Sequence, residues 1–269
     1  MALKKISGFP AGVPALRHGS AGSCPAFNLY RRIKARTLAA ASLSGLICLR
    51  ILPMNIELAR QQMIEQQVHA WDVFDERVLS TMRTVRREQF APAPFSQVAF
   101  ADASIPLPGG QSMLPAKVHG RILQALLPNP ADVALEVGTG SGYLSACLGL
   151  LAARVRTVEI LPELAEIARR NLFAAAVNNV AVEVGDGMQL TEQSSYDVIA
   201  VTGSLPLYDE RFQQALRIGG RLFVVVGQAP VMEAWKVTRV GEREWQRESL
   251  FETVLAPLLN APRPSEFVF

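Results

Sequence analysis

The sequence is poor in cysteine, and its three cysteines, Cys24, Cys48 and Cys147, have no spacing typical of a metal site. A disulfide framework is typical of short chains with an even number of cysteines, whereas this chain has three cysteines in 269 residues. Cys147 falls at helical spacing among leucines, which favours a buried thiol over a nucleophile. We therefore predict neither a disulfide nor a bound metal.

Acidic residues are absent from residues 1–53, which hold eight of the 27 basic residues. The remaining chain has 19 basic against 24 acidic residues, and this mild negative charge gives no reason to expect nucleic-acid binding. The apolar run 37–53 is interrupted by Arg50 and is shorter than the roughly 20 residues of a membrane helix. It also lacks the small-residue cleavage site of a secretory signal. We expect neither a nucleic acid nor a membrane as partner.

Two interpretations of residues 1–53 stay open. An acid-free leader that is rich in Arg and contains Ser resembles an organellar transit peptide. Alternatively, the segment is a disordered or non-native leader, upstream sequence read in frame with a natural start at Met54. We favour the second interpretation because the composition changes abruptly at Pro53 and Met54, where a helical pattern begins.

The rest of the chain divides into three predicted regions. Residues 54–130 contain helices at 55–68, 75–83 and 117–127, with an irregular Pro- and Gly-rich stretch at 91–115 that forms a substrate loop. Residues 131–255 alternate β-rich runs with helical segments, and residues 256–269 form a tail. The predicted strands are 132–138, 154–160, 180–186, 196–203 and 220–227, the helices 141–152, 162–177 and 208–217, and the last strand pair 234–240 and 244–254.

This alternation predicts an α/β fold. Short buried strands separated by helices are typical of a parallel sheet that is covered on both faces. We expect a doubly wound Rossmann-like sheet with an N-terminal helical subdomain and a C-terminal antiparallel strand pair.

A glycine-rich turn follows the first strand of this sheet. It contains Gly138, Thr139, Gly140 and Gly142, and Glu136 precedes it. Glycine lets the backbone approach a ligand at the carboxyl edge of the sheet, where doubly wound folds bind their cofactors. The spacing G-x-G-x-G with a preceding Glu differs from the dinucleotide pattern G-x-G-x-x-G, and it favours S-adenosylmethionine (AdoMet) over NAD.

Acidic residues also end the next two strands. Glu159 lies near the offset at which an acid binds the ribose hydroxyls, and Asp186-Gly187 ends the third strand, where the carboxylate can bind the adenine amino group. Each acid alone is equally well explained as part of a solvated turn. Their joint occurrence with the glycine turn predicts a cofactor site formed by Glu136, Gly138, Thr139, Gly140, Gly142, Glu159, Asp186 and Gly187.

Residues 54–254 resemble the protein-L-isoaspartate O-methyltransferase family. The shared residues are Gln62, Met63, Ile64 and Gln66, the stretches 75–79, 82–90 and 135–143, Glu159 with 162–164, and the stretches 185–187, 196–202 and 219–222. The resemblance implies a cytoplasmic, monomeric enzyme that repairs damaged proteins by methylating the α-carboxylate of isoaspartyl residues with AdoMet. A protein or peptide carboxylate is already ionised at pH 7, so the resemblance implies no catalytic base.

The substrate loop departs from the family pattern. The family reads Gly-Gln-Thr-Ile-Ser-Gln where this chain has residues 110–115, so Leu114 replaces the family's active-site Ser. Gln111 and Ser112 remain candidate substrate contacts. An apolar side chain at this position predicts weak transfer to isoaspartyl peptides. It leaves open an alternative, a family member that has lost isoaspartyl repair and acts on another acceptor or as a binding module.

Overall fold

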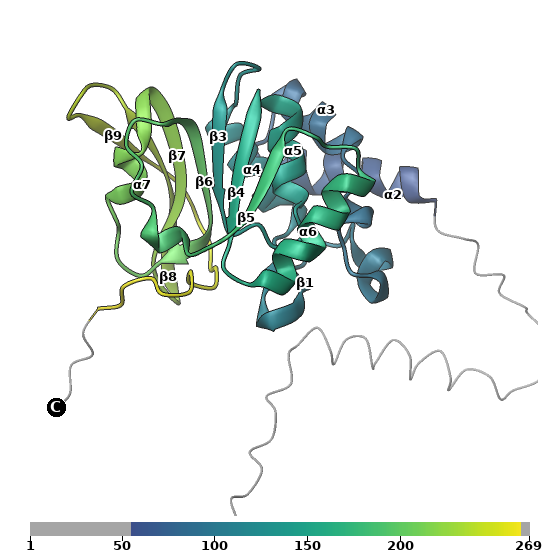
Figure 1. Cartoon of the computed structure of the whole chain (residues 1–269). Coiled ribbons are helices and arrows are strands. Elements are labelled where there is room, and N and C mark those ends of the chain that lie inside the picture. Colours follow the sequence, from purple (N-terminus) through teal and green to yellow (C-terminus); the bar gives the residue numbers. More distant parts are fainter. Residues whose placement is uncertain (1–54, 265–269) are drawn as a thin grey trace, which may run out of the picture. The chain divides into compact units, whose positions relative to one another are not determined.

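The computed structural model describes residues 55–264, and the predictions for residues 1–53 lie outside this range. A seven-stranded sheet in the order β5-β4-β3-β6-β7-β8-β9 forms its centre (Figure 1). Strands β5 to β7 of this order run parallel, and β8 and β9 are added antiparallel. The strands are β3 (Val133–Val137), β4 (Arg154–Glu159), β5 (Val180–Val184), β6 (Tyr196–Leu205), β7 (Leu216–Gln228), β8 (Val231–Arg239) and β9 (Trp245–Glu252). The predicted fold class is confirmed.

Alternating side chains divide the core between the two faces of the sheet. Ala200 and Phe223 pack with helices α4 (Ala116–Leu126), α5 (Tyr143–Leu151) and α6 (Pro162–Ala174). Their neighbours Val201 and Leu222 pack on the other face with Phe212 of the short helix α7 (Arg211–Gln214). Successive strand residues point to opposite faces, so strands buried on both sides are apolar throughout.

The helical front, residues Ile56–Thr84, packs on the α4 side (Figure 1). Helix α2 (Ile56–Met63) continues into a π-helical turn (Ile64–Val68), and α3 (Glu76–Thr84) follows. The Asp75 carboxylate accepts hydrogen bonds from the backbone N–H groups of Arg77 and Val78, so it caps the N-terminus of α3.

Two local predictions were wrong. The helix predicted at 208–217 is limited to α7, because β7 begins at Leu216, which pairs with Tyr196 of β6. The stretch 91–115 is not irregular throughout, since β1 (Ile105–Pro106) pairs antiparallel with β2 (Ser112–Met113). The connecting turn uses Gly109 and Gly110 at φ 67° and 72°, a region that favours glycine. We call residues Ser104–Leu114 the β1–β2 ribbon.

Within residues 55–264, none of the helices combines the length and apolar character that crossing a membrane requires. The same part of the chain contains no group of three or more His, Cys, Asp or Glu residues placed to hold a metal ion.

Candidate functional site

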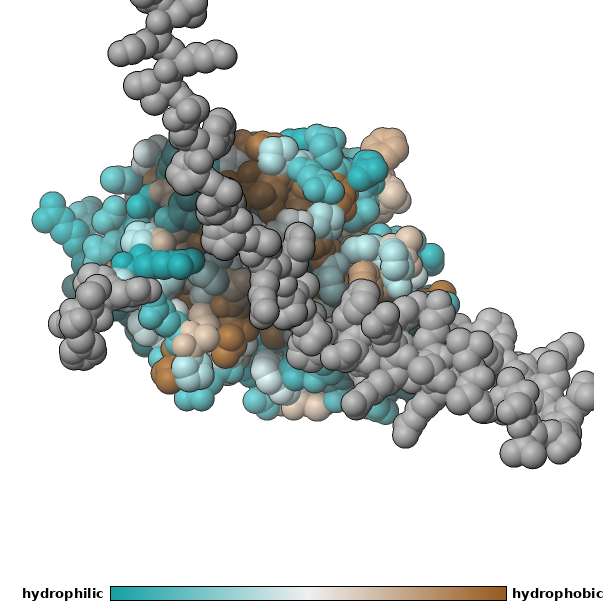
Figure 2. All heavy atoms as spheres, turned by 90° about the horizontal axis from the view of Figure 1, so that it is seen from below, coloured by the Kyte–Doolittle hydropathy of each residue, from teal (hydrophilic) through white to brown (hydrophobic). Residues whose placement is uncertain are grey.

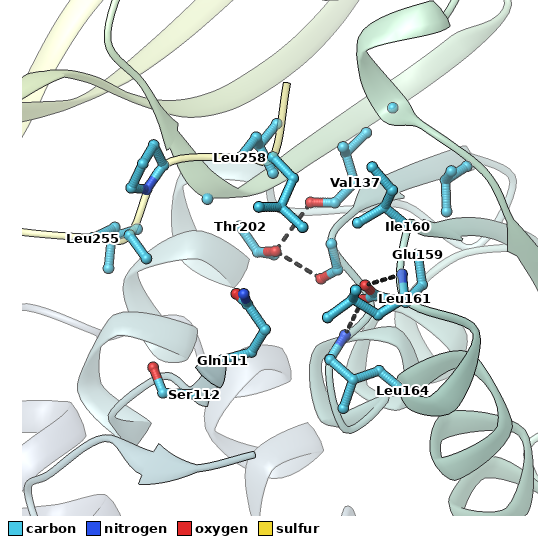
Figure 3. Close-up of a pocket in the computed structure, with 18 of the residues that line it drawn as sticks. Gln111, Ser112, Val137, Glu159, Ile160, Leu161, Leu164, Thr202, Leu255 and Leu258 are labelled. Carbon is cyan, nitrogen blue, oxygen red and sulfur yellow. Dashed lines mark hydrogen bonds between the residues drawn. The ribbon is translucent and has the colours of Figure 1, made fainter. Parts of the chain in front are cut away.

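A pocket of about 140 Å³ lies at the carboxyl ends of β3, β4, β5 and β6. Figure 3 shows Glu159 and Leu161 on one side and Gln111 and Ser112 on the other, with Leu258 on a third side. Parallel strands bring their carboxyl ends to one edge of the sheet, so residues from distant parts of the chain meet here. We call the wall formed by the strand ends the cofactor side and the wall formed by the β1–β2 ribbon the acceptor side.

The glycine turn forms the floor of the cofactor side. Gly138, Gly140 and Gly142 all have positive φ, at 94°, 54° and 85°. Gly138 and Gly140 line the pocket, whereas Gly142 begins helix α5 and lies against the backbone of Ala168. The Thr202 hydroxyl at the end of β6 hydrogen-bonds the carbonyl oxygen of Gly138 at 2.6 Å, and this contact fixes the turn.

Glu159 closes the cofactor side at the end of β4. Its side chain is largely buried, and its two carboxylate oxygens accept hydrogen bonds from the backbone N–H of Gly140 at 2.9 Å and of Leu161 at 3.1 Å. The carboxylate therefore holds the glycine turn to the next loop. Each carboxylate oxygen can accept more than one bond, so the group can still bind a ligand.

Asp186 lies at the end of β5 and faces the same pocket. One carboxylate oxygen accepts from the backbone N–H of Met188 at 2.8 Å, and the other accepts from the Asn260 amide at 3.0 Å. Gly187 packs so closely on Val137 that a side chain there would clash. The Asn260 contact ties the cofactor side to the C-terminal part of the fold.

Glu136 does not line the pocket and is buried behind the glycine turn. One of its oxygens accepts hydrogen bonds from the hydroxyls of Ser145 and Thr157, and the other has no partner within residues 55–264. Burial raises the pKa of this carboxyl to about 8, so it is mostly protonated at pH 7. Thr139 likewise bonds Thr157 behind the turn.

The predicted cofactor residues thus separate into two groups. Gly138, Gly140, Glu159, Asp186 and Gly187 line the pocket together. Glu136, Thr139 and Gly142 lie behind them and support the turn. Val137 lines the pocket, and successive strand residues point to opposite faces, so the side chain of Glu136 points away from it.

The acceptor side contains the predicted Gln111, Ser112 and Leu114, and also Ser104, which sequence reasoning missed. Leu114 is only 9% exposed. The fully buried Arg87 fixes the ribbon from the core, because its guanidinium donates to the carbonyl oxygens of Leu114 at 2.6 Å and of Ala99 at 2.9 Å.

The acceptor side is completed by residues 254–261, which we call the C-terminal segment. The backbone N–H of Ser204 donates to the carbonyl oxygen of Ala256, and the N–H of Leu258 donates to the carbonyl oxygen of Ser204, both at 2.9 Å. The segment was predicted as a tail from residue 256 and not as part of the site. The closely spaced apolar residues Leu255, Leu258 and Leu259 were the signal that could have revealed it.

Among residues 55–264, the pocket lining contains the acids Glu159 and Asp186 and no Lys, Arg or His. Its rim is partly apolar, since Val254 is 60% and Leu259 45% exposed. Figure 2 views this end of the molecule and shows hydrophobic residues surrounded by hydrophilic ones. A bound carboxylate would therefore have to be held by neutral donors and not by a basic side chain.

Comparisons with known proteins agree with this geometry. The family model described as protein-L-isoaspartate(D-aspartate) O-methyltransferase matches residues 58–261. A protein-L-isoaspartate O-methyltransferase of Koribacter versatilis is 39% identical over 76% of this chain and 91% of its own length, and one of Rhodopseudomonas palustris is 38% identical over 74% and 92%. A crystal structure from Plasmodium falciparum, described as a putative protein-L-isoaspartate O-methyltransferase in complex with S-adenosyl-L-homocysteine, aligns with 74% of this chain and 97% of that chain. Its TM-score is 0.66 at 19% sequence identity, which supports the fold.

Proposed function

The chain belongs to the protein-L-isoaspartate(D-aspartate) O-methyltransferase family, and on this premise we propose that it methylates the α-carboxylate of L-isoaspartyl residues in damaged proteins with AdoMet. The observation that carries the proposal is one pocket with two opposed walls. Strand-end acids and a glycine turn form one wall, and a ribbon of neutral polar groups forms the other.

The cofactor side fits an adenosine ligand. We infer that the Glu159 carboxylate accepts from the ribose hydroxyls and the Asp186 carboxylate from the adenine amino group, because both acids face the pocket from adjacent strand ends. Gly138 and Gly140 leave the turn without side chains, so that the backbone can approach the ligand. When bound, AdoMet supplies an electrophilic methyl group on a positively charged sulfur.

The residues on the acceptor side have to position a carboxylate and exclude water. An isoaspartyl α-carboxylate with a pKa near 4 is ionised at pH 7 and needs no base to become a nucleophile. The lining that residues 55–264 provide agrees, since it contains no His or Lys that could serve as one. Catalysis by this chain then consists mainly of holding the carboxylate oxygen in line with the methyl group in a closed pocket.

The substrate is a segment of protein chain, and the apolar rim at Val254 and Leu259 suits contact with its neighbouring residues. We propose that residues 131–255 bind the cofactor, while residues 54–130 and the C-terminal segment hold the acceptor. A cytoplasmic location and a monomeric state, which the family resemblance implies, stay predictions. Size-exclusion chromatography with light scattering would test the second.

A methyl-transfer assay tests the proposed function. Labelled AdoMet is offered with an isoaspartyl peptide and with the matched peptide that contains ordinary aspartate. We expect base-labile label in the isoaspartyl peptide alone. No label in either peptide, while S-adenosylhomocysteine still binds, would contradict the proposal and favour a family member that has lost isoaspartyl repair.

A further inference from the structure

The β1–β2 ribbon has two distinct faces. Ile105 pairs with Met113 and both are buried in the core, whereas the next pair, Pro106 and Ser112, lies on the exposed face. Extending this register by one residue places Ser104 opposite Leu114. Directly opposite residues of an antiparallel pair project from the same face, so Ser104 and Leu114 share the face that lines the pocket.

The pocket has few hydrogen-bond donors for a carboxylate. The Thr202 hydroxyl is committed to the carbonyl oxygens of Val137 and Gly138, and the Gly140 N–H is committed to Glu159. The Gln111 amide makes a long contact of 3.4 Å with the Gly109 carbonyl oxygen. Among residues 55–264, Ser104 and Ser112 have no hydrogen-bond partner for their hydroxyls, and both line the pocket.

We propose that Ser104 is a specificity-determining residue whose hydroxyl binds the acceptor carboxylate. The inference rests on the proposed function. Side chains at directly opposite positions have Cβ atoms about 5 Å apart, so a hydroxyl at either position reaches nearly the same point in the pocket. Leu114 provides no donor there, and Ser104 supplies one from the paired strand.

The backbone next to Ser104 is held in place, whereas the Ser104 side chain itself is exposed. Leu114, which lies opposite in the extended register, is held through its carbonyl oxygen by Arg87, and the neighbouring Ile105 is fully buried. A serine whose neighbouring backbone is already held in place has little freedom left to lose when its hydroxyl binds a carboxylate.

The first test compares Ser104→Ala with Ser104→Thr, which keeps the hydroxyl. The matched control is Ser80→Ala, an exposed serine of α3 far from the ribbon in sequence. Kinetics with the isoaspartyl peptide and calorimetric titration with S-adenosylhomocysteine are measured for each. We expect Ser104→Ala to raise KM about tenfold or more, since a hydrogen bond to a charged group is lost, with unchanged S-adenosylhomocysteine affinity. Ser104→Thr and Ser80→Ala should stay within about twofold of wild type.

The second test moves the hydroxyl across the ribbon. The double variant Ser104→Ala/Leu114→Ser should reverse much of the KM increase that Ser104→Ala causes, and melting temperatures are recorded for both proteins. A merely structural serine would not be rescued from position 114. If the double variant does not fold, Ser104→Ala and Ser104→Thr decide the matter alone.

The outcomes separate this inference from the proposed function. Wild-type KM and kcat in Ser104→Ala, or equal losses of peptide and S-adenosylhomocysteine binding, would overturn the role of Ser104 while leaving the function intact. Absence of isoaspartyl methylation by the wild-type protein would overturn the proposed function, and the role of Ser104 with it.

Discussion

The two opposed walls of the pocket are built by different means. The cofactor side uses the ends of adjacent parallel strands, where Gly138, Glu159 and Asp186 each lie within two residues of the end of β3, β4 or β5. The acceptor side combines a ribbon of two-residue strands with a segment more than 130 residues later in the chain. Regular topology thus creates one wall, and isolated long-range contacts create the other.

The two walls are also held in place by different contacts. The cofactor side is held by hydrogen bonds of the residues that line it, such as Glu159 with Gly140. The acceptor side is held from outside the pocket, by Arg87 behind the ribbon and by Ser204 behind the C-terminal segment. A change in a lining residue should therefore disturb the cofactor side more than the acceptor side.

The largest expected effect is on the cofactor side. Glu159→Ala removes both the proposed ribose contact and the bond to the Gly140 N–H, so the turn loses its anchor. We expect S-adenosylhomocysteine to bind about ten- to a hundredfold more weakly, since charge-assisted hydrogen bonds are lost. Calorimetric titration measures this, with the exposed Glu163→Ala in α6 as control. Wild-type affinity in the Glu159 variant would contradict the proposed ribose contact and the expectation that lining residues hold the cofactor side.

A second prediction concerns the support behind the turn. The Glu136 pKa is raised to about 8 from an ordinary 4.5, so its contribution to stability is fully present below pH 4.5 and is lost as the pH rises through about 8. Glu136→Gln has the shape of the protonated carboxyl but cannot ionise, so the variant should not lose this contribution as the pH rises. Between pH 6 and 9 we expect wild type to lose roughly 2 to 3 kcal/mol more unfolding free energy than the variant, because about two pH units of this interval lie below the raised pKa. Urea unfolding at several pH values measures this. Equal pH dependence of wild type and variant would show that folding does not raise the pKa of Glu136.

A smaller effect is expected where the two walls meet. Asn260→Gly removes the amide that occupies one Asp186 oxygen, and glycine retains the positive φ of this position. The freed carboxylate should bind S-adenosylhomocysteine about two- to threefold more tightly, because one weak exposed bond no longer competes. Weaker binding would instead show that Asn260 helps to hold the ligand. The melting temperature serves as the control for folding.

The smallest effect is expected for residues 1–53. Both walls come from residues after 100, and the family match begins at residue 58. Removal of residues 1–53 should leave the melting temperature within about 2 °C and S-adenosylhomocysteine affinity unchanged. A clearly larger fall in melting temperature would show that the segment packs on the remainder of the chain.

Sequence reasoning predicted the cofactor side better than the acceptor side for a physical reason. Strands β3 to β6 are runs with a clear apolar pattern, and their glycines and acids lie at fixed offsets from the strand ends. Ser104 belongs to a ribbon whose strands are too short to show a period of two. The C-terminal segment is placed by its backbone bonds to Ser204, about 50 residues earlier, and backbone bonds leave little trace in the choice of side chains.

The bond from Arg87 to the Leu114 carbonyl separates the position of the ribbon from the identity of its side chain. A carbonyl oxygen is present whichever residue stands at position 114, and an arginine stays charged across the physiological pH range. Mutations can therefore exchange the group presented to the acceptor while the backbone stays in place. In evolutionary terms, the side chain at position 114 can change while its backbone stays anchored, and a compensating residue on the opposite strand can preserve the original activity.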